Sequence, residues 1–207
     1  IVLIATRQPW YPLSNTPKKA RIVNIDETPF RDHVVYQPSS AERFLEGDVA
    51  ANLALLVDAL KAAKTDHDAV TKRRTQWNEA AEIRHAEAVA HITDARAQAT
   101  ISPALLVATL SEMAPAGTIF VDETITHRPA IIGHLKTDGP TSYFRVHGGL
   151  GQAMGVALGA KLAAPDQMVI TTLGDGTFLY NPAVQALAFA RTNNLATLTV
   201  IFNNHGY

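Results

Sequence analysis

The sequence contains no cysteine, so disulfide bonds, thiolate nucleophiles and cysteine-based metal sites are excluded by composition. It also has no excess of charge of one sign, because 18 Lys and Arg residues stand against 19 Asp and Glu residues. A chain without a basic stripe cannot neutralise a run of phosphates. We therefore expect no nucleic-acid partner.

Long apolar runs are missing as well. None approaches the roughly 20 residues that span a bilayer, and no basic start followed by an apolar core indicates a signal peptide. We expect a cytoplasmic protein with no membrane partner. The chain also lacks an initiator Met: it opens on the strand-like residues 1–5 and stops at Tyr207, just after another strand-like run. We interpret it as part of a longer protein.

The first part of the chain combines short apolar runs with an amphipathic stretch. Residues 1–5 and 21–26 are rich in β-branched residues and predict strands. Asp48 stands at an N-cap position before residues 49–63, whose apolar side chains recur at helical spacing. Residues 65–100 are charged and Ala-rich, which predicts an exposed linking helix.

From residue 101 onward, predicted strands and helices alternate. Ser102 and Pro103 are a typical helix start. Continuous apolar runs, as in strands buried on both faces of a parallel sheet, occupy 118–122, 168–173 and 197–202. Helices are predicted near 126–135, 151–163 and 182–192. The predicted fold class is α/β, with parallel sheets flanked by helices in two partial domains, 1–64 and 101–207, joined by the charged helix 65–100.

Polar motifs directly follow two of these strands. Gly174-Asp175-Gly176 follows 168–173, and Asn203-Asn204 follows 197–202, with one predicted crossover helix between them. The carboxyl ends of neighbouring parallel strands meet at one edge of the sheet, about 5 Å apart. The carboxylate of Asp175 and the amide oxygen of Asn204 are hard oxygen ligands, and glycines 176 and 206 allow close backbone approach. The pattern predicts an all-oxygen magnesium site with room for phosphate.

A glycine-rich segment, His147 to Gly155, opens the helix predicted at 151–163. Gly151, Gly155 and Gly159 recur every four residues, so we expect a smooth face that packs closely on a strand or a cofactor. The turn before it exposes backbone groups that suit a heterocycle. No Gly-x-Gly-x-x-Gly follows a strand, which disfavours nicotinamide binding.

The order GDG, 26 residues, NN resembles the motif of thiamine-diphosphate-dependent enzymes, and the Gly-Gly-Leu-Gly turn, with Leu150 lying 25 residues before Asp175, also resembles that family. The chain is most similar to the branch containing acetolactate synthase and benzoylformate decarboxylase. Residues 1–64 resemble the latter part of its middle domain, and 101–207 resemble the first part of its diphosphate-binding domain. The resemblance implies a 2-oxo acid decarboxylase or carboligase that uses thiamine diphosphate and Mg²⁺ and assembles as a homodimer or homotetramer.

By this resemblance, Asp175, Asn204 and the main-chain carbonyl of Gly206 ligate magnesium. Leu150 is the apolar wedge under the cofactor rings. Further cofactor contacts are implied for Gly148, Gly149, Gly176, Thr177 and Thr126. The glutamate that activates the cofactor belongs to a separate domain in the family, so we expect this chain alone to be inactive. His127 and His205 are the histidines expected nearest the cofactor and are the candidates for a catalytic role.

Three alternatives stay open. An acyl-CoA lyase of the oxalyl-CoA decarboxylase type would need a nucleotide-binding surface in the middle domain. A noncatalytic cofactor-binding homologue would lack the activating domain altogether. A plain magnesium-dependent phosphate-binding α/β protein would not distinguish thiamine diphosphate from other diphosphates. Flavin, held by the middle domain in some relatives, is not predicted.

Overall fold

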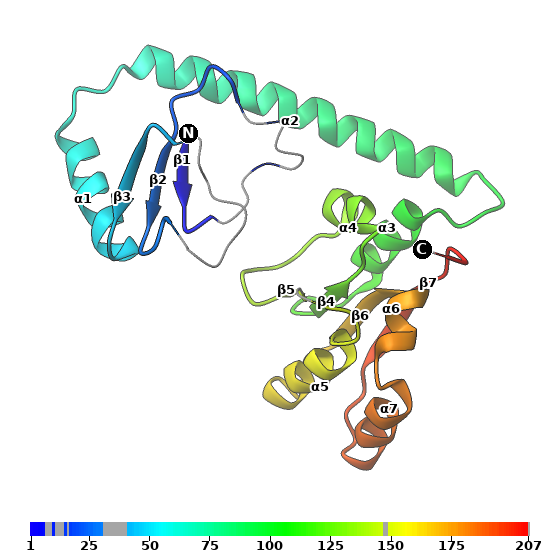
Figure 1. Cartoon of the computed structure of the whole chain (residues 1–207). Coiled ribbons are helices and arrows are strands. Elements are labelled where there is room, and N and C mark those ends of the chain that lie inside the picture. The colour runs from blue at the N-terminus through cyan, green and yellow to red at the C-terminus, as the bar shows by residue number, and fades with distance from the viewer. Residues whose placement is uncertain (7–9, 11–14, 16, 31–40, 147–148, 207) are drawn as a thin grey trace. The chain divides into compact units, whose positions relative to one another are not determined.

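A computed structural model describes residues 1–6, 10, 15, 17–30, 41–146 and 149–206. The chain divides into two compact units, Ile1–Arg73 and Arg74–Tyr207, and each contains one parallel sheet (Figure 1). The predicted α/β class is confirmed. The unit boundary falls inside a long helix, and the domain bounds proposed from the sequence stay a prediction. Within the described ranges, none of the helices has both the length and the apolar character needed to cross a membrane.

The first unit is built on the sheet β1-β2-β3, in which all neighbours are parallel. β1 (Val2–Ile4) and β2 (Val23–Asp26) match the two predicted strands. β3 (Arg43–Glu46) was not predicted, because its four residues are mostly exposed and carry little apolar signal. It leads into α1 (Val49–Ala62), where the Asp48 side chain accepts a hydrogen bond from the Ala51 N–H at 2.7 Å, as the sequence predicts for an N-cap.

The charged segment forms one helix of 30 residues, α2 (His67–Arg96). Only Ile92 and Ala95 are buried in it, which agrees with the exposed helix expected from its composition. Ile92 packs against Ala104 and Ala108 of α3 (Pro103–Met113). This contact lies wholly within the second unit.

The sheet of the second unit has the order β5-β4-β6-β7 and is parallel throughout. β4 (Ile119–Glu123), β6 (Val169–Gly174) and β7 (Leu198–Phe202) match the three predicted strands. The three-residue edge strand β5 (Tyr143–Arg145) was missed. Because β6 and β7 are direct neighbours, the two polar motifs do follow adjacent strands, as predicted.

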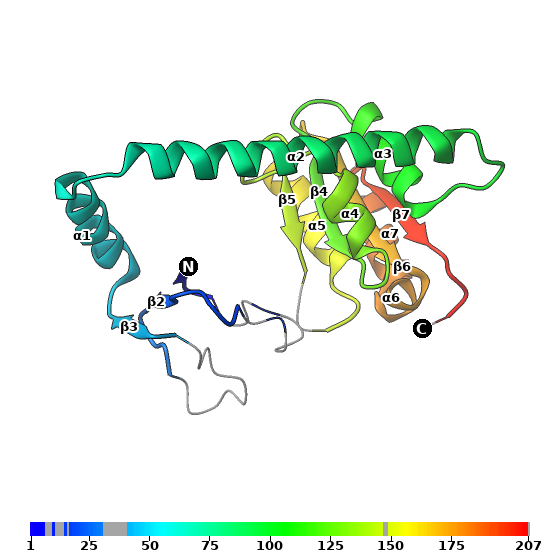
Figure 2. The same cartoon turned by 90° about the horizontal axis from the view of Figure 1, so that it is seen from above.

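Helices cover both faces of this sheet (Figures 1 and 2). On one face, α5 (Ala153–Ala163) and α7 (Ala183–Thr192) pack on alternate residues of β4 and β6. On the other face, α3 and α4 (Arg128–His134) pack on β7. A further helix, α6 (Asp175–Tyr180), was not predicted, so two helices rather than one connect β6 to β7.

The expected role of the glycine spacing on α5 is wrong in the described structure. The helix begins at Ala153 rather than at Gly151, and its buried face is formed by Ala153, Met154, Ala157 and Leu158. Gly155 and Gly159 lie on the exposed face, where an added Cβ would meet nothing within 4 Å. They do not allow α5 to approach the sheet. Gly151 has a different role, in the turn before the helix.

Candidate functional site

A cavity of about 190 Å³ lies where β4, β6 and β7 end. Four chain segments contribute to it: the loop after β4, the turn before α5, the first turn of α6, and the residues after β7. Its lining includes most of the residues selected from the sequence, namely Thr126, His127, Leu150, Asp175, Gly176, Thr177, Asn204 and Gly206. Gly149 is described but does not line it, and Gly148 lies outside the described residues. The predicted motifs therefore converge.

The donor set of this cavity suits a magnesium ion and a diphosphate. β6 ends at Gly174, and α6 begins at Asp175, so the first turn of this helix, which includes Asp175 and has N–H groups without an intrahelical partner, lines the cavity. The amide of Asn204 and the backbone of Gly206 add neutral oxygen donors. The described residues contain no cluster of three His, Cys, Asp or Glu side chains, and a site with one carboxylate, one amide and one carbonyl does not require one.

A second, wider cavity of about 550 Å³ adjoins the first and shares Asp175, Gly176 and Gly206 with it. His205 lines this cavity in a left-handed backbone conformation, with φ of 61°. Its N–H donates to the side-chain oxygen of Asn203 at 3.0 Å, which closes a tight turn after β7. Asn204 lies in this turn, between the two residues, Asn203 and His205, that the hydrogen bond joins.

The other candidate histidine, His127, lines the smaller cavity. It precedes α4, and its ring centroid lies 5.3 Å from that of Phe202. Both histidines therefore border the cavities formed by the motif residues. Their role in catalysis stays a prediction.

A buried carboxylate, Asp122, holds together the strand ends beneath the site. It is fully buried and pairs with Arg145 of β5 at 2.6 Å. It also accepts hydrogen bonds from the hydroxyl of Tyr143, from the N–H and hydroxyl of Thr124, and from the hydroxyl of Thr172. Burial, and next the charge of Asp122, raise the pKa of Tyr143 to about 12, so its hydroxyl remains a donor at neutral pH.

The sequence analysis missed the next residue, Glu123, which is also buried. Its carboxylate accepts hydrogen bonds from the N–H groups of Gln152 and Ala153 and from the side-chain amide of Asn181. These partners lie 29, 30 and 58 residues away in the sequence. No local pattern reveals such contacts. The only local signal was a pair of acidic residues, Asp122 and Glu123, at the end of an apolar strand.

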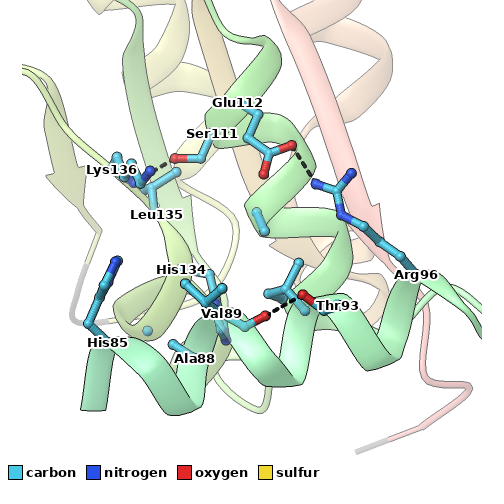
Figure 3. Close-up of a pocket in the computed structure, with 13 residues that line it drawn as sticks. His85, Ala88, Val89, Thr93, Arg96, Ser111, Glu112, His134, Leu135 and Lys136 are labelled. Atoms are coloured by element: carbon cyan, nitrogen blue, oxygen red, sulfur yellow. Dashed lines mark hydrogen bonds and ion pairs between the residues drawn. The ribbon is translucent and has the colours of Figure 1, made fainter. Parts of the chain in front are cut away.

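A further cavity of about 370 Å³ lies between α2, α3 and α4, away from the motif residues (Figure 3). Several of its polar groups are engaged: Arg96 pairs with Glu112, and the hydroxyl of Ser111 accepts the N–H of Lys136. His134 also lines it. Burial, and next the neighbouring His91, lower the pKa of His134 and favour its neutral form. Among the described residues, none of the motif residues selected from the sequence lines this cavity.

Comparison with known proteins places the convergent motifs in context. Residues 126–207 match the family model described as "Thiamine pyrophosphate enzyme, C-terminal TPP binding domain". A stretch of 108 residues is 32% identical to a benzoylformate decarboxylase of Pseudomonas aeruginosa, covering 52% of this chain and 20% of that protein. Over 191 residues the chain is 25% identical to an acetolactate synthase large subunit of Parasynechococcus marenigrum, covering 90% of this chain and 28% of that protein.

The fold is shared with a solved structure described as a putative thiamin diphosphate-dependent enzyme from Mycobacterium smegmatis. The TM-score is 0.64 at 22% identity, and the match covers 98% of this chain and 37% of that one. This likeness extends over both units of the chain. The chain thus spans between a fifth and about two fifths of the length of the proteins it matches.

Proposed function

This chain belongs to the family of thiamine-diphosphate-dependent enzymes, and on that premise we propose that it supplies the diphosphate- and magnesium-binding part of a 2-oxo acid decarboxylase or carboligase. The observation that carries the proposal is the convergence of Asp175, Asn204 and Leu150 on one pair of adjoining cavities. These residues lie up to 54 positions apart in the sequence, and parallel pairing of β6 with β7 brings two of their segments together.

Each group has a distinct part in this proposal. Asp175, Asn204 and the carbonyl of Gly206 would hold Mg²⁺, while the first turn of α6, with Gly176 and Thr177, would bind the diphosphate oxygens. Leu150 would present an apolar surface to the rings of the cofactor. When bound, thiamine diphosphate supplies the electron sink for cleaving the bond beside the carbonyl of a 2-oxo acid. The residues of this chain bind and orient it.

The test is a calorimetric titration of the natural full-length protein with thiamine diphosphate, with and without Mg²⁺. We expect binding that depends on Mg²⁺ and that weakens at least about tenfold in Asp175→Ala, because this change removes the only carboxylate that lines the smaller cavity among the described residues. Asp166→Ala is the matched control, since Asp166 lies exposed in the loop before β6. Binding that persists without Mg²⁺, or that survives Asp175→Ala, would contradict the assignment.

Two further titrations separate the alternatives. Inorganic pyrophosphate that competes as well as thiamine diphosphate would favour a plain phosphate-binding protein. Binding of coenzyme A would favour an acyl-CoA lyase. Release of carbon dioxide from a panel of 2-oxo acids is the activity expected of the proposed function, and its absence from a protein that binds the cofactor normally would favour a noncatalytic homologue.

A further inference from the structure

Glu123 is an unusual buried group, because it is a carboxylate with no cationic partner among the described residues. It is 3% exposed, at the last position of β4. A buried charge of this kind is strongly unfavourable unless hydrogen bonds replace its lost hydration. The hydrogen bonds that it accepts from described residues all come from neutral N–H donors: Gln152 at 3.0 Å, Ala153 at 3.0 Å and the amide of Asn181 at 3.3 Å.

Two of these donors belong to the start of α5. The N–H groups of a first helical turn have no partner within the helix, and Gln152, at the N-cap position, makes no side-chain capping bond. Glu123, at the end of β4, therefore caps the N-terminus of α5. Its negative charge there interacts favourably with the positive end of the helix dipole. The N–H of Met154, the next in the helix, donates to the Asn181 side-chain oxygen at 3.2 Å.

Asn181 connects Glu123 and the start of α5 to the end of α6. It is buried and follows the last residue of that helix, and its amide group donates to Glu123 and to the carbonyl of Thr177 at 2.9 Å. The preceding residue, Tyr180, presses against the turn before α5: a Cβ added at Gly151 would lie 2.3 Å from the Tyr180 carbonyl oxygen. Three segments thus meet in one buried contact set, formed by Glu123, Asn181 and the start of α5.

These are the segments that carry the candidate site. Leu150 lies two residues before Gln152, and the Gln152 N–H donates a hydrogen bond to Glu123. Asp175 and Thr177 lie in the short helix α6. Asn181, at the C-cap of this helix, donates a side-chain hydrogen bond to the Thr177 carbonyl. We propose that Glu123 and Asn181 are positioning residues that fix the apolar wedge Leu150 relative to the diphosphate-binding turn at Asp175. This inference rests on the proposed function and deepens it.

The expected consequence is a change in ligand selectivity rather than a general loss of binding. Inorganic pyrophosphate would need only the groups that bind the diphosphate and Mg²⁺, whereas thiamine diphosphate would have to fit both those groups and the wedge. In Glu123→Gln, an NH₂ group replaces one oxygen and faces donors only, so the contact set is disrupted without a change in side-chain volume. The ratio of thiamine diphosphate to pyrophosphate affinity should fall about tenfold, which corresponds to about 1.4 kcal/mol.

The experiment titrates both ligands, with Mg²⁺, into the natural full-length protein and its variants Glu123→Gln and Asn181→Ala. Both should lose affinity for thiamine diphosphate selectively, and Glu79→Gln, on the exposed face of α2, should leave the ratio unchanged. If Glu123→Gln does not fold, the affinity ratio of Asn181→Ala alone tests the inference. An equal loss for both ligands, or an unchanged ratio, would overturn the inference. A wild type that does not prefer thiamine diphosphate would instead overturn the proposed function, and the inference with it.

Discussion

The turn before α5 has no room for a side chain at Gly151. Gly151 has φ of 96°, which L side chains rarely adopt, and a Cβ at this position would lie 2.3 Å from the Tyr180 carbonyl oxygen and 2.7 Å from its carbon. Both neighbours are backbone atoms, so no rotamer change can relieve the contact. The positive φ costs about 1–2 kcal/mol for alanine, and the forced backbone shift costs about 1–3 kcal/mol more. Gly151→Ala should therefore lose about 2–5 kcal/mol of stability.

Gly155 provides the matched control, four residues further along. Its position is helical and exposed, and an added Cβ would meet nothing within 4 Å. Alanine is the better helix former there, so Gly155→Ala should gain about 0.5–1 kcal/mol. The two variants carry the same Gly-to-Ala change, but the expected changes in the free energy of unfolding have opposite signs. Urea unfolding of both, followed by circular dichroism, measures the difference between them.

A single result would refute this reasoning. If Gly151→Ala unfolds within about 0.5 kcal/mol of the wild type, which is the range of a neutral surface change, then the turn does not press on Tyr180 as described. A loss of the predicted size is large against the total stability of a domain, about 5–15 kcal/mol. Reduced expression of the variant is therefore also expected.

Three other outcomes are expected. Asp122→Asn should cost about 3–5 kcal/mol in urea unfolding, because it leaves the charge of Arg145 buried, whereas Glu42→Gln, at an exposed ion pair, should leave the urea midpoint nearly unchanged. Burial, and next the charge of a neighbouring histidine, lower the pKa of His134. Its contribution to stability is present above the ordinary histidine pKa of about 6.5 and is lost as the pH falls through the lowered pKa, so the urea midpoint should drop below about pH 6.5, and less so in His134→Gln. Chelation of Mg²⁺ should weaken thiamine diphosphate binding in the wild type at least as much as Asp175→Ala is expected to weaken it in excess Mg²⁺.

The sequence predicts the parts of this fold that rest on long periodic signals. β4, β6 and β7 are continuous apolar runs, and their parallel order brings the motifs after β6 and β7 to one edge. β3 and β5 were missed because edge strands of three or four residues carry too little pattern. α6 was missed because its six residues begin inside a motif that is also a common turn.

The site was only partly predictable, for a different reason. Asp175, Asn204 and Leu150 belong to spaced motifs and could be selected from the sequence. Glu123 and Asn181 could not, because their function depends on partners at 27 to 58 residues' separation that only the folded chain brings together. The glycine spacing on α5 was misread for the same reason, since periodicity identifies a face of a helix but not what that face meets.

Asp122 and Glu123 show how two adjacent buried carboxylates can have different roles. Successive side chains of a strand point to opposite faces, so Asp122 lies among β5 and β6 residues while Glu123 points to α5 and α6. Arg145 neutralises the first, and three N–H groups compensate the second. Loss of Asp122 should therefore appear as lost stability with both ligands affected alike, and loss of Glu123 as lost selectivity. A selective loss of thiamine diphosphate affinity in Asp122→Asn would contradict this division.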